Sequence, residues 1–386
     1  MTAVPAPVPV PRYGDAALSD LLPSVLASLG VAGEPATIAL PPARRTVLLL
    51  VDGMGLELLQ RHTDVAPFLS GLQRSALTTG FPATTATSLS SIGTGLAPGE
   101  HGITGYTSWV AEVDGAVGWL TWTLGREDLR ERLVPERSQP RPTVFERAER
   151  AGVAVTVAAP AVFEGSGLTR AVLRGGTYLG AVTPGDSVAH AVAGSRRGDR
   201  SLVYCYTPDL DLIGHVRGTD SDAWLSQLAL VDRYAEELAG RLPADTALLV
   251  TADHGMVDVP PGSQVDFDAS PALQHGVRAL AGEPRARHVH VEDGAARDVL
   301  ATWQAELGDR MAVLTREQVI AAGLLGPVVT PAASDRTGDV VAIATCEVAV
   351  VRREHERLLS GLRGQHGALT DAERLVPLLR WPAPPA

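Results

Sequence analysis

Carboxylate and imidazole side chains recur in this chain at the ends of short apolar runs, where they could bind metal ions. Asp52 directly follows the run TVLLLV, and Asp253 and His254 follow the run TALLVT. Asp211 and His215 come after a third run, SLVYCY, and are four residues apart. On a helical turn this spacing places both side chains on one side, where they can hold the same metal ion. The pattern indicates metal-dependent chemistry.

Each of these residues alone also has an ordinary structural explanation. Asp52 precedes a glycine, and because Asp-Gly is a common turn, a turn or helix cap is favoured when Asp52 is considered alone. An isolated Asp-His pair more often makes a structural hydrogen bond. Three acidic strand ends, two of which also carry a histidine, are much harder to explain in this way, and together they favour metal ligands.

Two further segments add a hydroxyl and a third imidazole. The segment GFPATTATSLSSIGTG (80–95) predicts a helix whose N-terminus carries Thr84 or Thr85. The free N–H groups there attract an anion such as phosphate, although a simple threonine N-cap explains the segment equally well in isolation. His366 lies in GQHG near the end of the chain, where the glycines allow close backbone approach.

The candidate ligands are oxygen and imidazole groups without thiolate. This donor set suits Zn²⁺ or Mn²⁺, and the three imidazoles favour Zn²⁺. Two such ions can bridge a transferring phosphoryl group. Metal coordination also activates a threonine hydroxyl, which is otherwise a poor nucleophile. The residues therefore predict a two-metal phosphoryl-transfer site.

The elements that position these residues alternate between strand and helix. Continuous apolar runs predict buried strands, and a helix with an apolar face begins near Ser221; the strand runs are 46–51, 153–159, 201–206, 246–251 and 339–344. This alternation is typical of an α/β fold with a mostly parallel sheet flanked by helices. Ligands bind at the carboxyl ends of the strands in such sheets, which is where the candidate residues stand.

The domain organisation predicted from this rhythm has three parts. Residues 1–35 form a Pro-rich tail and a first helix near 19–29, and residues 36–255 with 336–386 form the catalytic core. Residues 256–335 interrupt the alternation and predict a small α+β cap insertion. Within it we expect a half-exposed strand at 287–292, a helix at 295–307, a strand at 311–314 and a helix from Thr315.

Composition narrows the class of protein. The net charge of −11 disfavours a nucleic-acid groove, because binding to a phosphate backbone relies on clustered Lys and Arg. No apolar stretch approaches the roughly 20 residues of a membrane span, and the N-terminus does not resemble a signal peptide. Cys205 and Cys346 are expected to be buried free thiols, which suits a reducing compartment. We therefore expect a cytoplasmic protein.

Taken in order, the motifs resemble the alkaline phosphatase superfamily, and most closely its nucleotide pyrophosphatase/phosphodiesterase branch. FPATT looks like the F-P-x-x-T nucleophile motif, and TGLAPGEHGI looks like the segment that follows it. DLIGH matches D-x-x-G-H, ADHGM matches S/T-D-H-G-M except at Ala252, and GQHG matches G-x-H-G. The five motifs span the chain from about Thr46 to Leu379. The cysteine motif of sulfatases is absent.

The resemblance implies an alkaline-phosphatase-like fold, two metal ions and a nucleophile at Thr85 rather than Thr84. It implies that one zinc is held by Asp52, Thr85, Asp253 and His254, and the other by Asp211, His215 and His366. Asp209 is a poorer candidate than Asp211, because only Asp211 keeps the four-residue step to His215. Tyr106 stands where the branch has an asparagine that binds a phosphoryl oxygen.

The resemblance also implies a reaction and a substrate class. We expect hydrolysis of a phosphodiester or nucleotide pyrophosphate bond through a threonine-bound intermediate, with a small phosphate ester, such as a nucleotide, as substrate. Trp109, Trp119 and Trp122 could stack on a base or simply pack a covering loop. The alternatives are a phosphomonoesterase, a phosphonate or phospholipid-headgroup hydrolase, and a non-catalytic metal-binding protein.

Overall fold

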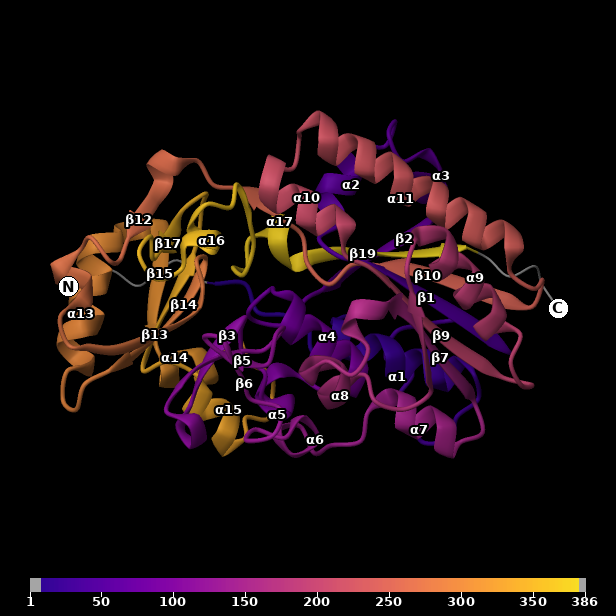
Figure 1. The fold of residues 1–386 in the computed structure, drawn as a ribbon, viewed down its shortest axis with the longest axis horizontal. Helices are drawn as coiled ribbons and strands as arrows, with labels where there is room; N and C mark the ends of the chain where they lie inside the picture. The colour runs from indigo at the N-terminus through magenta and orange to yellow at the C-terminus, as the bar shows by residue number, and fades with distance from the viewer. Residues whose placement is uncertain (1–7, 382–386) are drawn as a thin grey trace.

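The chain folds into two lobes that lie side by side along the long axis of the molecule (Figure 1). The computed structural model describes residues 8–381, so residues 1–7 of the expected Pro-rich tail lie outside the described part. The larger lobe is built on a seven-stranded sheet and the smaller on a four-stranded sheet. The larger lobe carries the candidate residues that precede position 255.

The large sheet has the strand order β2-β19-β10-β1-β9-β7-β8. The strands are β1 (Arg45–Val51), β2 (Gln73–Thr78), β7 (Ala154–Pro160), β8 (Thr177–Ala181), β9 (Ser201–Thr207), β10 (Thr246–Thr251) and β19 (Leu375–Trp381). The strands from β10 to β8 are mutually parallel, and β19 and β2 add antiparallel pairs at one edge. The expected α/β class with a mostly parallel sheet is confirmed.

The three central strands are buried because their apolar side chains are covered on both faces of the sheet. Helices lie on both sides in Figure 1. One side has α1 (Leu18–Ser28), α4 (Thr85–Thr94), α7 (Val144–Arg150) and α8 (Gly167–Val172), and the other has α2 (Leu56–Arg61), α3 (Pro67–Gly71), α9 (Pro184–Ser195), α10 (Asp209–Arg217) and α11 (Asp222–Arg241).

Two of the expected helix starts can be compared with the structure. Ser221 is the N-cap of α11, and its hydroxyl accepts the N–H of Trp224 at 3.2 Å, as expected. The buried face of α11 includes Trp224 and Leu228. The first helix begins at Leu18, one residue before the start expected from the sequence, because Ala17 is its N-cap and donates its N–H to the Asp20 carboxylate at 2.9 Å.

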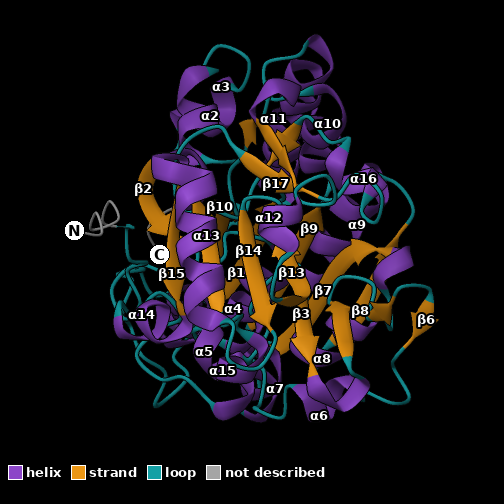
Figure 2. Ribbon diagram, turned by 90° about the vertical axis from the view of Figure 1, so that its left-hand side faces the viewer, coloured by secondary structure: helices purple, strands orange, loops and turns teal. Residues whose placement is uncertain are grey.

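The smaller lobe has its own hydrophobic core. Its antiparallel sheet has the order β13-β14-β16-β15, with β13 (Val277–Glu283), β14 (Ala286–Val291), β15 (Met311–Thr315) and β16 (Val340–Ala344). Its helices are α12 (Pro271–Gln274), α13 (Ala296–Leu307), α14 (Arg316–Ala321) and α15 (Pro331–Arg336). Figure 2 looks onto this lobe, with α13 in front of the sheet.

Two sequence predictions for this lobe are wrong. The apolar run that we assigned to the parallel sheet forms β16, which pairs with β14 and β15 instead, because an apolar run does not specify which sheet receives it. The strand expected to be half exposed forms β14, whose residues Ala286–His290 are all buried between β13 and β16 and beneath neighbouring elements. We therefore propose that the insertion extends beyond residue 335, to about residue 365.

Short elements connect the lobes and cover the site. A small sheet follows α5 (Pro98–His101) and contains β3 (Thr107–Val110), β4 (Gly115–Gly118), β5 (Thr123–Leu124) and β6 (Glu127–Asp128). The remaining strand pairs are β11 (Val257–Asp258) with β18 (Gly364–Gln365) and β12 (Gln264–Asp266) with β17 (Ala349–Val351). The remaining helices are α6 (Pro135–Ser138), α16 (Arg357–Ser360) and α17 (Asp371–Arg374). Within residues 8–381, no helix has the length and apolar character of a membrane span.

Candidate active site

The seven predicted metal-binding or nucleophilic residues come together at one edge of the large sheet. Strand β1 lies between β9 and β10, with Val51 beside Thr207 and Leu50 beside Thr251. The segments that leave these three strands at their carboxyl ends are therefore neighbours. They carry Asp52 after β1, Asp211 and His215 on α10 after β9, and Asp253 and His254 after β10. Helix α4 adds Thr85, and the loop after β18 adds His366.

The first group of ligand atoms surrounds His254. Its Nε2 lies 3.4 Å from Oδ1 of Asp52, 3.4 Å from Oδ2 of Asp253 and 3.2 Å from Oγ1 of Thr85. All four residues are buried. Asp52, Asp253 and His254 each offer an atom within 4.8 Å of the others, which is close enough for one metal ion to bind all three.

The second group is centred on Asp211. Its Oδ2 lies 3.2 Å from Nε2 of His215, and its Oδ1 lies 3.9 Å from Nε2 of His366. The three atoms that lie within 4.8 Å of one another belong to Asp211, His366 and His254, so His254 adjoins both groups. The sequence placed it in the first group alone. His215 contacts Asp211, as its four-residue spacing from that residue predicted, but it lies outside the closest triplet.

The backbone fixes all three imidazole rings with Nε2 facing the site. Each Nδ1–H donates to a main-chain carbonyl: His215 to Gly364 at 2.7 Å, His254 to Gly255 at 2.9 Å, and His366 to Ala83 at 2.9 Å. The proton on Nδ1 leaves the Nε2 lone pair available. Metal-binding histidines in proteins are typically oriented in this way, so the rings fit the predicted role.

The carboxylates show the same preparation. Oδ2 of Asp52 accepts the hydroxyl of Tyr206 at 2.5 Å, and Oδ1 of Asp253 accepts the N–H groups of Gly53 and His254, each at 3.1 Å. One oxygen on each of Asp52, Asp253 and Asp211 is buried without a hydrogen-bond partner among the described residues. Because buried carboxylate oxygens are costly to leave unpaired, these three oxygens fit divalent cations.

Crowding of charge shifts the pKa values of the group. Burial raises the pKa of Asp52 well above its usual range, and the neighbouring Asp253 and Asp211 carboxylates add to the rise. Burial also raises the pKa of Asp211, but the adjacent His215 and His366 outweigh it and leave that pKa below its usual range. Burial lowers the pKa of His366 well below its usual range. Burial therefore favours the neutral form of His366, whereas the Asp211 carboxylate outweighs burial at His215 and raises the pKa of that imidazole.

Gly53 shows how tightly the strand ends approach each other. Its φ of 73° lies in the left-handed region, and a Cβ added there would lie 3.0 Å from Cα of Asp211. A side chain at this position would strain the backbone and displace the second ligand group. Glycine here allows the turns after β1 and β9 to pack against each other.

Thr85 is the first residue of α4, and Thr84 is its N-cap. The Thr84 side chain makes no capping hydrogen bond, so capping does not account for the threonine pair. The Thr85 hydroxyl contacts His254, whereas no such contact exists for Thr84. The free N–H groups of the first turn of α4 favour a phosphoryl oxygen beside Thr85.

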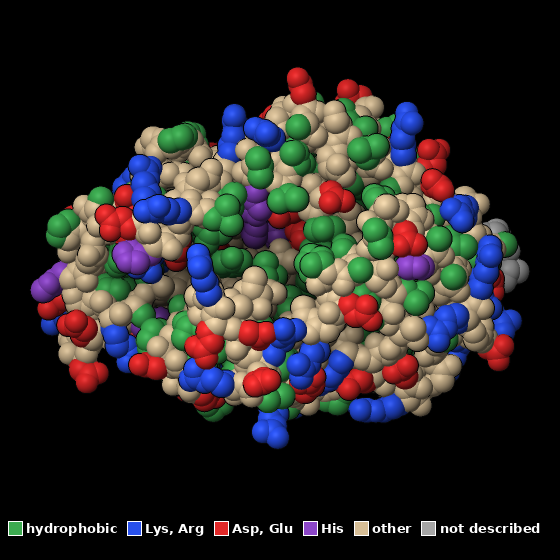
Figure 3. Space-filling view, viewed as in Figure 1, with side chains coloured by type: hydrophobic (Ala, Val, Ile, Leu, Met, Phe, Trp, Pro, Cys, Tyr) green, Lys and Arg blue, Asp and Glu red, His purple; other side chains and the backbone are tan. Residues whose placement is uncertain are grey.

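Two cavities adjoin Thr85. One, of about 320 Å³, is mainly apolar; it includes Asp52, Thr85 and Asp211 and is walled by Leu89, Leu120, Phe163, Leu168, Tyr178, Tyr206 and Leu212. The other, of about 70 Å³, lies between Thr85, Tyr106, His215, Glu283 and His366. Figure 3 shows a hollow in the middle of this face, with histidine and acidic side chains at its floor and hydrophobic side chains around it.

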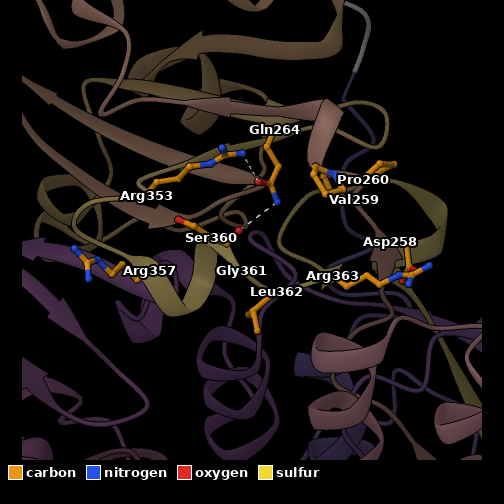
Figure 4. A pocket seen from close by; sticks show the side chains of 11 residues that line it. Asp258, Val259, Pro260, Gln264, Arg353, Arg357, Ser360, Gly361, Leu362 and Arg363 are labelled. Atoms are coloured by element: carbon orange, nitrogen blue, oxygen red, sulfur yellow. Dashed lines mark hydrogen bonds and ion pairs between the residues drawn. The ribbon is translucent and has the colours of Figure 1, made fainter.

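A larger cavity of about 810 Å³ lies between the segments around β11, β12 and α16 and contains none of the predicted site residues (Figure 4). Its wall includes Asp258, Gln264, Arg353 and Arg363, and most of these side chains pair with each other or with nearby carboxylates. Leu362 lines both this cavity and the small cavity beside Thr85. The larger cavity is therefore a neighbour of the site and not its centre.

The aromatic residues that follow the nucleophile segment, for which both substrate contact and loop packing were open, divide into two kinds. Tyr106 lines the small cavity, as its position in the sequence suggested. Trp119 and Trp122 are fully buried and pack edge to face, with ring centroids 5.0 Å apart. Trp109 packs against His290 and beneath Arg278 in the smaller lobe. The tryptophans thus pack the covering loop and line neither cavity.

The sequence reasoning missed Tyr206 and Glu283. Tyr206 contacts Asp52 and lines the apolar cavity, and its place at the end of a strand run was a usable signal. Glu283 reaches the small cavity from the smaller lobe, and it had no local sequence signal.

The chain is similar to known proteins in sequence and in fold. Residues 46–369 match the sequence model of the type I phosphodiesterase / nucleotide pyrophosphatase family. Murine ectonucleotide pyrophosphatase/phosphodiesterase 5 is similar in structure, with a TM-score of 0.69 and 18% identity over 86% of this chain and 87% of that chain. An inactive threonine-to-alanine variant of that protein in complex with AMP gives 0.68 and 18%, with 87% of each chain covered.

The human counterpart is also similar, with a TM-score of 0.68 and 17% identity over 87% of each chain. These identities are low, so the likeness to solved structures shows the fold. A comparison with curated proteins finds no match.

Proposed function

Because this chain belongs to the type I phosphodiesterase / nucleotide pyrophosphatase family and is a hydrolase of that kind, we propose that Thr85 is its nucleophile. The substrate is a phosphodiester or nucleotide pyrophosphate. The observation that carries this proposal is the contact of the Thr85 hydroxyl with His254, between two sets of inward-facing ligands.

Two divalent ions fit the residues. Asp52, Asp253, His254 and Thr85 would hold one ion, and Asp211, His215 and His366 would hold the other, with His254 close to both. Zn²⁺ is favoured over Mn²⁺ by the three imidazoles. When bound, such ions lower the pKa of a coordinated hydroxyl and stabilise charge on phosphoryl and leaving oxygens.

The reaction then proceeds in two displacements. The oxygen of Thr85, having lost its proton to solvent, forms a bond to phosphorus while the bond to the leaving oxygen breaks, and that oxygen keeps the electron pair. In the second step, water loses a proton to solvent and forms the new bond to phosphorus, while the Thr85–phosphorus bond breaks and the Thr85 oxygen keeps the electron pair. The N–H groups at the start of α4 face the transferring group and hold it in line.

The apolar cavity supports a nucleotide as the group that remains on phosphorus. Phe163, Tyr178 and Tyr206 offer ring surfaces within it, and Leu120 and Leu212 add aliphatic surface. A nucleobase presents an apolar face of matching character. The structure of the murine relative was solved in complex with AMP, which is a nucleotide.

The test compares the two adjacent threonines. Purified protein is assayed with Zn²⁺ or Mn²⁺ on a chromogenic phosphodiester and the matching monoester. Thr85→Ala should lower kcat by at least about 10³-fold, as loss of a nucleophile does. Thr84→Ala should lose far less activity than Thr85→Ala, because the Thr84 side chain makes no capping hydrogen bond and does not contact His254.

Other results would change the assignment. Full activity of Thr85→Ala would refute the nucleophile. A preference for the monoester would favour the phosphatase alternative. No turnover with any metal would favour a non-catalytic metal-binding protein.

A further inference from the structure

Glu283, the last residue of β13, is a buried carboxyl group that the smaller lobe presents to the active site. Glu283 is 4% exposed, so it is almost fully removed from solvent. One oxygen, Oε2, accepts the backbone N–H of Tyr106 at 2.7 Å. The other oxygen, Oε1, has no hydrogen-bond partner among the described residues. A buried carboxyl oxygen left unpaired in this way is costly and calls for an explanation.

The position of Glu283 is fixed from two sides. The hydroxyl of Thr107 donates to the carbonyl of Gly282, the neighbour of Glu283, at 2.9 Å, which ties the end of β13 to the start of β3. On the other side lies Gly367, whose φ is 130°. A Cβ added to Gly367 would lie 2.5 Å from Cγ of Glu283. The carboxyl group is therefore clamped between the Tyr106 loop and the loop that carries His366.

Glu283 and Thr85 line the same small cavity. The same cavity is lined by Thr84, Tyr106, Asp211, His215 and His366. At about 70 Å³, it has room for a phosphoryl group's outer oxygens rather than for a nucleoside. The cavity thus brings Glu283 of the smaller lobe and Thr85 of the larger lobe to the same space.

The surroundings of Glu283 favour its neutral form. Burial raises the pKa of Glu283 to about 8, opposed by the N–H of Tyr106 and the charge of Arg287 on β14, while Glu373 on α17 adds to the rise. Asp211, His215 and His366 face it across the cavity. A neutral carboxylic acid carries an O–H group, and buried acids of this kind can donate a hydrogen bond to an oxyanion.

We propose that Glu283 is a further catalytic residue, whose O–H donates a hydrogen bond to a non-bridging phosphoryl oxygen of the substrate in this cavity. The inference rests on the proposed function, because it takes Thr85 as the group that attacks phosphorus. No bond to hydrogen is broken: the proton stays on Glu283 and stabilises the charge that grows on the phosphoryl oxygen. Tyr106 supports this donor through its backbone.

The test compares Glu283→Gln with Glu283→Leu in the metal-loaded full-length protein. The Gln side chain can accept from Tyr106 and still donate an N–H, so its kcat should stay within about threefold of wild type. The Leu variant should lose about 10²- to 10³-fold in kcat, as removal of an oxyanion donor does. Glu356→Gln is the matched control, because Glu356 pairs with Arg287 in the same lobe but does not line the cavity.

Two readouts separate this role from a structural one. In wild type, kcat/KM should be high below pH 8 and fall as the pH rises through the Glu283 pKa, whereas the Gln variant should lack this fall. Binding of orthovanadate, measured by calorimetry, should be at least about tenfold weaker in the Leu variant than in wild type, because one donor to the anion is lost.

If the Leu variant binds vanadate as tightly as wild type does, the proposal for Glu283 is overturned, whether or not the protein hydrolyses any ester. A Gln variant as impaired as the Leu variant would also overturn it. An absence of hydrolysis by wild type would instead refute the proposed function, so the two failures can be told apart. If the Leu variant does not fold, the pH profiles of wild type and the Gln variant decide.

Discussion

The hydrogen bond from Tyr206 to Asp52 can be removed by a single atom change. In Tyr206→Phe, Oδ2 of the buried Asp52 loses the hydroxyl that it accepts at 2.5 Å, while the ring that lines the apolar cavity remains. Burial raises the pKa of Asp52, and the Tyr206 hydrogen bond opposes that rise. The variant should therefore hold its carboxyl proton more strongly and its metal ion more weakly.

The size of the effect follows from the kind of bond. A hydrogen bond to a charged acceptor contributes about 1.5–3 kcal/mol. At about 1.4 kcal/mol for each factor of ten, its loss should weaken Zn²⁺ binding by about 10- to 150-fold. This is similar to the cost of removing other residues that hydrogen-bond to a metal ligand. The deficit should be larger at pH 6 than at pH 8, because proton and metal compete for Asp52.

Tyr204→Phe is the matched control. Tyr204 lies two residues earlier on the same strand and is fully buried, but its hydroxyl has no hydrogen-bond partner among the described residues. Its removal should leave Zn²⁺ affinity unchanged. The assay is competition for Zn²⁺ with a chelator of known affinity, followed by kcat at saturating metal. Equal affinities for wild type and Tyr206→Phe, or an equal loss in both variants, would refute the reasoning.

Two further predictions concern single carboxylates. Asp211→Asn should weaken Zn²⁺ binding by more than about 100-fold, because it changes a ligand and not only a residue that supports one. Asp209→Asn should leave Zn²⁺ binding unchanged. Competition with a chelator measures both. The opposite order would mean that the ligand is Asp209. Glu373→Ala should lower the free energy of unfolding by about 3–5 kcal/mol in chemical denaturation, because it strips the buried Arg285 of two hydrogen bonds of 2.7 Å. Glu237→Ala, in an exposed pair, should cost less than about 1 kcal/mol, and a similarly small loss for Glu373→Ala would contradict the argument.

The ends of the central strands could be predicted because they obey local rules. A continuous apolar run must be covered on both faces, so Asp52 and Asp253, which follow such runs, had to stand at one edge of a parallel sheet. The preference for Asp211 over Asp209 came from the helical period alone. The structure places Asp211 against His215 on α10, as that period requires.

The features that could not be predicted depend on contacts between distant segments. The run that forms β16 has the composition of a core strand, but its partners β14 and β15 are elements of the smaller lobe. From the sequence, Trp119 and Trp122 could either stack on a ligand or pack a loop, and the structure buries them against each other. Glu283 is joined to Tyr106 across 177 positions of sequence, and no periodicity reports such a contact.

The pairing of β11 with β18 has a consequence for how such a site can diversify. Val257 lies opposite Gln365, so the chain leaves and re-enters the metal site at one point. His254 precedes β11 and His366 follows β18. The segment between β11 and β18 therefore begins and ends at the same place. Its length or sequence can change without separating the two histidines. This segment also contributes Glu283 to the small cavity. Changes within it can therefore alter substrate selectivity while the metal ligands stay in place.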